Sequence, residues 1–81
     1  MDVIKLHILS PEGTLVQAEV SLVTLPGIVS SFTVLKDHAP LVTALVAGDI
    51  RYVTGGKEER LPIREGFVEV RDNLVTVCVE V

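Results

Sequence analysis

Two prolines in the middle of this chain restrict its secondary structure more than any other sequence feature. Pro26 fixes its own φ angle and lacks an amide donor, and the Gly27 that follows can adopt a left-handed backbone conformation, so this pair predicts a tight turn. Pro40 forces Ala39 into an extended conformation, so no helix can run through this position. The stretch Leu25–Leu45, which contains both prolines, is therefore expected to consist of short strands joined by defined turns.

The same part of the chain carries very little charge. Lys36 and Asp37 are the only charged residues between Val20 and Gly48. A small domain does not need so long an uncharged segment for its core alone. We therefore expect part of this segment to lie on a surface that a partner covers.

The composition favours strands over helices and limits the chain to one domain. Valine, isoleucine and leucine account for 30 of the 81 residues, and branched aliphatic residues of this kind favour strands. With two phenylalanines, one tyrosine and no tryptophan, burial has to come from many aliphatic contacts. A chain this short is expected to form a single domain over residues 1–81, with modest stability from its own core.

Alternation of apolar and polar residues, interrupted by turn residues, defines the expected strands. In the first of them, Ile4, Leu6 and Ile8 fall on one face, which is typical of a half-buried strand. Gly55-Gly56 lies between two such segments and predicts a hairpin, and Pro62 assigns the second segment to a sheet edge or a bulge. The expected strands are residues 3–9, 14–18, 19–25, 32–35, 41–46, 50–54, 58–63, 67–70 and 74–81.

The expected turns between these segments lie at residues 10–13, 26–27, 48–49, 55–56, 65–66 and 72–73. Close spacing of short strands with no convincing helix favours an all-β fold, a flattened β-sandwich or barrel of roughly nine or ten short strands.

The charge distribution argues against several classes of function. The net charge is −4, and the seven basic residues are scattered from Lys5 to Arg71, which argues against nucleic acid as a partner. The uncharged run Val20–Leu35 is too short and too broken to span a bilayer, and the N-terminus lacks the features of a signal peptide. We therefore expect an intracellular protein. Cys78 is the single cysteine, so an internal disulfide is excluded and no cysteine-based metal site is expected.

The sequence offers little that could perform catalysis. His38 lies beside Asp37 in a proline-fixed turn, so a catalytic pair is conceivable there. The neighbouring serines and threonines lie in no recognised nucleophile motif, and Gly55-Gly56 lacks the lysine and hydroxyl residue of a phosphate-binding loop. His7 lies on the polar face of the first strand, where a solvated side chain is expected. We therefore predict no enzymatic activity in this chain, no cofactor and no metal.

Several motifs, in order along the chain, resemble one known family. They are Leu25-Pro26-Gly27, Phe32-Thr33-Val34-Leu35, His38-Ala39-Pro40-Leu41 and Gly48-Asp49-Ile50-Arg51, with Ser10–Gly13 before them and Gly66–Val70 and Asn73–Val77 after them. This pattern resembles the epsilon subunit of F-type ATP synthases, and the resemblance covers nearly the whole chain.

The resemblance implies a fold, partners and a location. Members of this family have an N-terminal β-sandwich that binds the foot of the gamma subunit and rests on the ring of c subunits. A helical hairpin usually follows, and this chain ends at Val81, where the hairpin would begin. The implied function is a non-catalytic rotor subunit of the central stalk that helps couple proton flow to ATP synthesis. It would lie on the cytoplasmic side of the bacterial inner membrane, associated with the membrane only through the complex.

The resemblance also implies which residues contact the partners. The family commonly has an acidic residue where Ser31 stands, so the usual charged contact with the c-ring is missing. Ile28 and Val29 stand where small or acidic residues are usual, and we predict that they form an exposed apolar knob that replaces this contact. The alternative is that one or both pack onto the core or continue a strand. Exposure of this pair would also allow the isolated chain to self-associate. The expected contacts with gamma and the c-ring are Ile28, Val29, Ser31, His38, Leu41, Val42 and Thr43.

Two other functions remain open. One is a free-standing β-sandwich adaptor that binds another protein, and the weaker one is a small enzyme that uses His38. Recovery of gamma and c subunits together with this chain would favour the rotor subunit over the adaptor.

Overall fold

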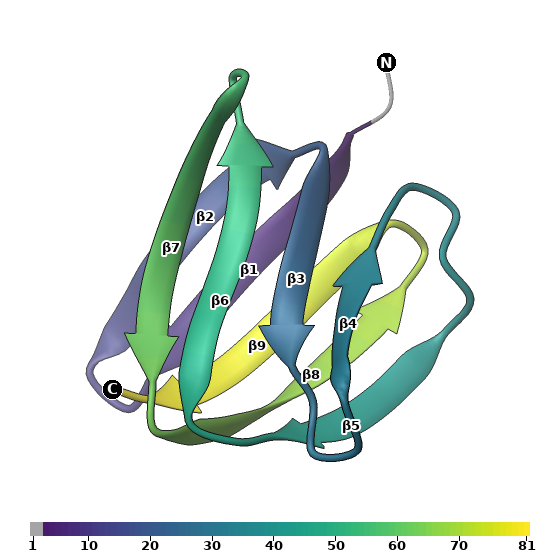
Figure 1. Cartoon of the computed structure of the whole chain (residues 1–81). Coiled ribbons are helices and arrows are strands. Elements are labelled where there is room, and N and C mark those ends of the chain that lie inside the picture. Colours follow the sequence, from purple (N-terminus) through teal and green to yellow (C-terminus); the bar gives the residue numbers. More distant parts are fainter. Residues whose placement is uncertain (1–2) are drawn as a thin grey trace.

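The computed structural model describes residues 3–81, which fold into two facing β-sheets (Figure 1). Over these residues the chain forms nine strands and no helix, so the predicted all-β sandwich is confirmed. The strands are β1 (Ile4–Ser10), β2 (Gly13–Val20), β3 (Leu22–Pro26), β4 (Ser31–Val34), β5 (Leu41–Leu45), β6 (Gly48–Thr54), β7 (Lys57–Ile63), β8 (Glu65–Arg71) and β9 (Leu74–Glu80).

The two sheets differ in size and strand order. The larger sheet has the order β2-β1-β9-β8-β5, and the smaller has the order β4-β3-β6-β7. Paired strands run antiparallel except β1 and β9, which come from opposite ends of the chain and run parallel in the middle of the larger sheet. The molecule measures 32 × 22 × 18 Å.

The core consists of the inward-facing aliphatic residues of both sheets. In β1 these are Ile4, Leu6 and Ile8, as the alternation predicts, and in β9 they are the three valines at alternate positions. Among the described residues no polar or charged side chain is buried. Each aliphatic side chain that is fully buried contributes about 1.5–3 kcal/mol, so these residues supply the main stabilisation of the fold. The core residues are Ile4, Leu6, Ile8, Val20, Val23, Leu25, Val34, Leu45, Ile50, Ile63, Val68, Val70, Val75, Val77 and Val79.

The boundary between the second and third strands differs from the prediction. The break was expected between residues 18 and 19, but β2 continues to Val20 and the chain bends at Ser21. The buried residues on either side of this bend are Val20 and Val23, which are three positions apart instead of the two that a continuous strand requires. The bend therefore resets the inward face at the point where the chain leaves the larger sheet for the smaller one.

Two tight hairpin turns confirm the predictions from their residues. Gly55 and Gly56 have φ angles of 57° and 76° and connect β6 to β7. Asp72 and Asn73 have φ angles of 51° and 60° and connect β8 to β9. Positive φ at both central positions is the geometry that twisted antiparallel strands require of a two-residue connection.

Two other predicted turns are wrong, because their glycines lie inside strands. Gly48 begins β6 and Gly66 is the second residue of β8, while the bends fall one position earlier, at Ala47 and Arg64. A Cβ atom on Gly66 would collide with the backbone carbonyl oxygen of Cys78 on β9. Gly66 is therefore required for the close approach of two strands and not for a turn. Pro62, in contrast, lies as predicted on a sheet edge, because β7 has a partner on one side only.

Candidate partner-binding surface

The residues predicted to contact partners gather where the edges of the two sheets meet. β4 is an edge of the smaller sheet and β5 is an edge of the larger one (Figure 1). A surface hollow of about 280 Å³ lies in this region. We call it the patch, and it is lined by Gly27, Val29, Ser30, Phe32, His38, Leu41 and Thr43.

Four of the seven predicted contact residues line the patch, namely Val29, His38, Leu41 and Thr43. The other three, Ile28, Ser31 and Val42, are exposed neighbours that do not line it. Val42 projects from the opposite face of β5 to Leu41 and Thr43, because successive side chains of a strand alternate.

Backbone hydrogen bonds fix the turn between β3 and β4 to β5. The amide of Ile28 donates to the carbonyl of Ala44 at 3.0 Å, and the amide of Val46 donates to the carbonyl of Pro26 at 2.9 Å. Gly27 and Leu45 form an additional bridge between them. These bonds join a turn of the smaller sheet to an edge strand of the larger sheet, so the two sides of the patch are held together.

Gly27 allows this turn to close tightly. A Cβ atom at this position would lie 2.6 Å from the carbonyl oxygen of Ser30 and 2.9 Å from the ring of Phe32. Both distances are shorter than a non-bonded contact allows, so only glycine fits. The turn predicted at Pro26-Gly27 falls later, at residues 28–30, because Pro26 ends β3 and Gly27 forms a bridge with Leu45. Gly27 does not have a positive φ angle, so glycine is needed here for its packing against an aromatic ring and not for a left-handed conformation.

Ile28 and Val29 form the tip of this turn and are exposed. Val29 is 93% exposed and Ile28 is 61% exposed, so the alternative in which they pack onto the core is wrong. Exposure of apolar β-branched side chains to water is unfavourable in free energy. A partner surface that covered these side chains would remove this hydration cost. Their contact with a partner stays a prediction.

His38 is half-buried and held in a defined orientation. Its backbone amide donates to the carbonyl of Leu35 at 3.2 Å, and its Nδ1 lies 2.7 Å from the carbonyl oxygen of Ala39. A carbonyl oxygen can only accept, so Nδ1 carries a proton and donates this hydrogen bond. Nε2 then remains for contact with a partner.

The conceivable catalytic pair of Asp37 and His38 does not form. The carboxylate of Asp37 accepts a hydrogen bond from the side-chain amide of Asn73 at 3.2 Å, and the imidazole of His38 is bonded to Ala39. The two side chains of the pair therefore have separate partners, and the patch provides no acid–base arrangement.

The electrostatic character of the patch follows from its lining. Of the described residues that line it, none carries a carboxylate, an ammonium or a guanidinium group. A partner that covered the patch would be expected to contribute apolar and neutral polar groups, because a buried unpaired charge opposite such a lining would be costly.

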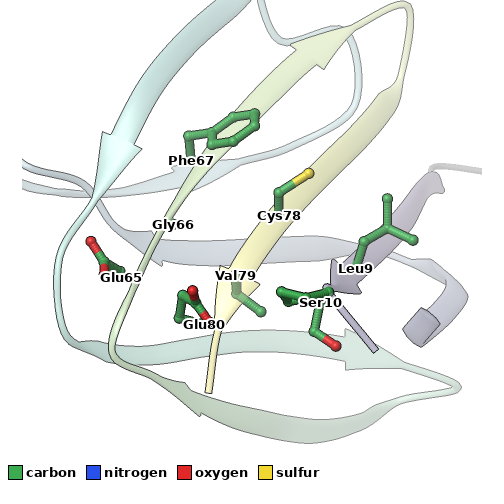
Figure 2. A pocket seen from close by; sticks show the side chains of 9 residues that line it. Leu9, Ser10, Glu65, Gly66, Phe67, Cys78, Val79 and Glu80 are labelled. Carbon is green, nitrogen blue, oxygen red and sulfur yellow. The ribbon is translucent and has the colours of Figure 1, made fainter. Parts of the chain in front are cut away.

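A second hollow, which sequence reasoning missed, lies on the outer face of the larger sheet. It measures about 670 Å³ and is lined by residues of β1, β8 and β9 and by the turn that follows β1. Figure 2 shows Leu9, Phe67 and Cys78 pointing to the same side of the sheet, and the strand register places them in one row. Glu65 and Glu80 also line it, and they lie opposite each other on β8 and β9. The sequence signal that could have revealed this surface is Phe67, an aromatic residue at an outward position of its strand.

Among residues 3–81, one side chain outside both hollows has a shifted pKa. Burial raises the pKa of Tyr52 above its ordinary value of 10.0, and the neighbouring carboxylate of Glu59 raises it further. Tyr52 and Glu59 face each other across β6 and β7. Both effects disfavour the phenolate, because it is poorly solvated and next to a negative charge.

Residues 3–81 contain no group of three or more histidine, cysteine, aspartate or glutamate side chains that could bind a metal ion. Over the same residues there is no helix with the length and hydropathy needed to cross a membrane.

Comparison with known proteins decides the family. The family model described as ATP synthase, Delta/Epsilon chain, beta-sandwich domain matches residues 3–81. The chain belongs to this family. The resemblance predicted from the motifs is thus confirmed.

Individual relatives agree with this assignment. The chain is 41% identical over 75 residues to the ATP synthase epsilon chain of Desulfitobacterium hafniense, covering 93% of this chain and 57% of that one. It is 42% identical over 81 residues to the ATP synthase epsilon chain of Nitratiruptor sp., covering 99% of this chain and 63% of that one. The chain thus spans somewhat more than half the length of these relatives.

A solved structure of the family's assembly shares the fold. The chain superposes on a chain of the Euglena gracilis mitochondrial ATP synthase, in a structure of the OSCP/F1/c-ring assembly, with a TM-score of 0.88 and 26% identity. The superposition covers 95% of this chain and 50% of that one. The β-sandwich described above is therefore the fold of the family's β-sandwich domain.

Proposed function

We propose that this chain is the β-sandwich of a non-catalytic rotor subunit in the central stalk of a proton-translocating F-type ATP synthase. In this role it binds the gamma subunit and the c-ring and helps couple proton flow to ATP synthesis. The observation that carries the proposal is membership of the ATP synthase delta/epsilon family over residues 3–81. The similarity to a chain from an assembly that includes F1 and the c-ring supports it.

The physical character of the domain suits a part that transmits torque. Such a part needs a stiff body and broad contacts, and it needs no catalytic residues. A close-packed aliphatic core deforms little under load, and the patch is fixed between the edges of both sheets by backbone hydrogen bonds. Force applied at the patch is therefore passed to both layers of the sandwich.

The patch and the apolar tip beside it are the proposed contact surface. Val29 and Ile28 project from the tip, while His38, Leu41 and Thr43 line the hollow. Burial of the exposed side chains supplies binding free energy, and the free Nε2 of His38 supplies a directional polar contact. Ser31 lies beside the tip and offers a hydroxyl group in place of a charge, whereas Val42 would meet a partner from the opposite face of β5.

The proposed location follows from the proposed complex. In a bacterial cell the domain would lie on the cytoplasmic side of the inner membrane, as a peripheral part of the ATP synthase. It would associate with the membrane only through its partners. When isolated at high concentration, the apolar tip is expected to promote self-association.

A reconstitution experiment tests this function. The purified chain is added to its own organism's ATP synthase from which the epsilon subunit has been removed, and the complex is then isolated through a tag on the catalytic subunits. Retention of the chain together with gamma and c subunits is the expected result. Absence of the chain from the isolated complex would contradict the proposal.

A further inference from the structure

A pair of side chains ties the loop that carries His38 to a distant turn. The loop of residues 35–40 joins β4 to β5, and Figure 1 shows it beside the turn between β8 and β9. The backbone amide of Asp37 donates to Oδ1 of Asn73 at 2.6 Å. In return, Nδ2 of Asn73 donates to Oδ1 of Asp37 at 3.2 Å. The two residues are 36 positions apart in the sequence, so the pair links separate parts of the fold.

The two hydrogen bonds of this pair fix the orientation of the side-chain amide of Asn73. The backbone N–H of Asp37 needs an acceptor, so the oxygen of the Asn73 amide must face it and the NH₂ group must face the carboxylate. Both residues also have positive φ angles, 65° for Asp37 and 60° for Asn73. Asparagine and aspartate tolerate this conformation better than other residues with side chains. Two backbone sites of restricted geometry are therefore joined by reciprocal hydrogen bonds.

We infer that Asn73 is a positioning residue for the patch, which it does not itself line. It holds the backbone of Asp37, and the next residue is His38, whose side chain lines the patch. The turn between β8 and β9 belongs to the larger sheet, so Asn73 fixes the loop to a rigid body. This inference rests on the proposed function, because it assigns to Asn73 the task of keeping the patch in its binding conformation.

Exchanging the aspartate and the asparagine between positions 37 and 73 separates this positioning role from a general effect on stability. Asn73→Asp keeps the acceptor for the amide of Asp37 but replaces the NH₂ donor by an oxygen that repels the carboxylate. Asp37→Asn keeps both hydrogen bonds, because its oxygen still accepts from Asn73. In the double variant the new amide of position 37 donates to the new carboxylate of position 73, so both bonds are restored. Asp37→Asn should therefore rescue Asn73→Asp.

A matched control lies in the same turn. Asn73→Gly removes both hydrogen bonds while keeping the positive φ angle that glycine tolerates. Asp72→Gly makes the same change at the adjacent residue, which also has positive φ but whose side chain is 93% exposed and lies 4.0 Å from Arg71. If Asn73 acts on the loop, only the first of these variants should alter it.

The loop is measured in the isolated chain by nuclear magnetic resonance. Hydrogen exchange at the His38 amide reports the loop without involving Asn73 directly, because this amide is bonded to Leu35. Loss of both bonds in Asn73→Gly should accelerate this exchange by roughly tenfold or more. The ¹⁵N shifts of the His38 ring report whether Nδ1 still donates to Ala39. Asp72→Gly should leave both signals unchanged, and so should the double exchange variant.

Binding to the epsilon-depleted ATP synthase completes the test. We expect Asn73→Asp and Asn73→Gly to bind about 2–10-fold more weakly, because a smaller fraction of the loop is in the binding conformation. The double variant should bind like the wild type. If the wild type binds and Asn73→Asp binds equally well, or if the loop signals do not change in Asn73→Gly, the inference is overturned while the proposed function stands. If the wild type itself does not bind, the proposed function fails and the inference fails with it.

Discussion

The apolar tip formed by Ile28 and Val29 provides a sharp test of the proposed contact surface. We consider the double change Ile28→Ser and Val29→Ser, which replaces both side chains with a small polar one. Because Val29 is 93% exposed and Ile28 is 61% exposed, neither contributes its full apolar surface to the core. The change should therefore affect binding much more than folding.

The magnitudes follow from the exposed fractions. A partner that covered both side chains would gain nearly the full burial of Val29 and somewhat more than half that of Ile28. At about 1.5–3 kcal/mol for each fully buried side chain, the loss on substitution is about 2.3–4.6 kcal/mol, which corresponds to roughly 50–2,000-fold in affinity. Ordering costs at an interface place the expected loss nearer the lower end of this range. The free energy of unfolding should fall by less than about 1 kcal/mol, and the melting temperature by less than about 8 °C.

Two measurements on the same proteins separate these effects. Thermal unfolding of the isolated variant gives the stability, and titration against the epsilon-depleted ATP synthase gives the affinity. Leu15→Ser is the control, because Leu15 is 41% exposed and lies on β2, at the other edge of the larger sheet from β5. Affinity equal to that of the wild type, or a loss no larger than that of Leu15→Ser, would refute the assignment of the tip as a contact.

Three further changes probe the patch and its scaffold. His38→Ala should leave the fold intact and weaken binding by about 1–2 kcal/mol, whereas His7→Ala, on β1, should bind normally. Equal effects of the two changes would show that His38 is only a turn residue. Gly27→Ala should destabilise the chain by about 1–3 kcal/mol in chemical denaturation, because the added carbon has no space in the closed turn, and unchanged stability would disprove this packing. The pKa of Tyr52 is raised by burial and by Glu59, so above pH 10.0 the unfolded chain loses this proton more readily than the folded chain. Stability should therefore fall as the pH rises above this value, and Tyr52→Phe should reduce that fall, as urea titrations at several pH values would measure.

Much of the fold could be predicted because its local signals agree with one another. The alternation of Ile4, Leu6 and Ile8 determines the inward face of β1, and the two glycines at 55 and 56 have positive φ angles as a hairpin requires. Pro62 predicts an edge strand or a bulge because proline has no amide hydrogen to donate to a neighbouring strand. Each of these features depends only on residues close in sequence.

The errors arose where a residue's role depends on a distant part of the chain. Gly48 and Gly66 were assigned to turns because glycine is common there, but a Cβ at position 66 would meet the backbone of β9 and one at position 48 would lie 3.0 Å from the Cβ of Pro26. The bend at Ser21 was placed too early because the sequence does not state where a strand passes from one sheet to the other. The roles of these glycines and the position of this bend are set by packing between strands that are distant in sequence.

The candidate site was predicted in part for the same reason. Val29, His38, Leu41 and Thr43 line one hollow because the turn after β3 and the start of β5 lie side by side. The family resemblance predicts Val42 as a contact together with Leu41 and Thr43, although alternation along β5 turns its side chain to the opposite face. The link between Asp37 and Asn73 joins residues 36 positions apart and could not be predicted from either segment alone.

The most direct test of the proposed function is a cross-link from the patch within the assembled complex. A photoreactive amino acid is introduced at Val29 and, as a control, at Leu15, and each chain is incorporated into epsilon-depleted ATP synthase of the same organism. After irradiation, the cross-linked peptides are identified by mass spectrometry. The proposed function predicts that the probe at position 29 joins this chain to the c subunit or to gamma, whereas the probe at position 15 does so much less. Incorporation of the chain without any cross-link from position 29 to either subunit would contradict the proposed contact surface, and failure of the chain to incorporate would contradict the proposed function.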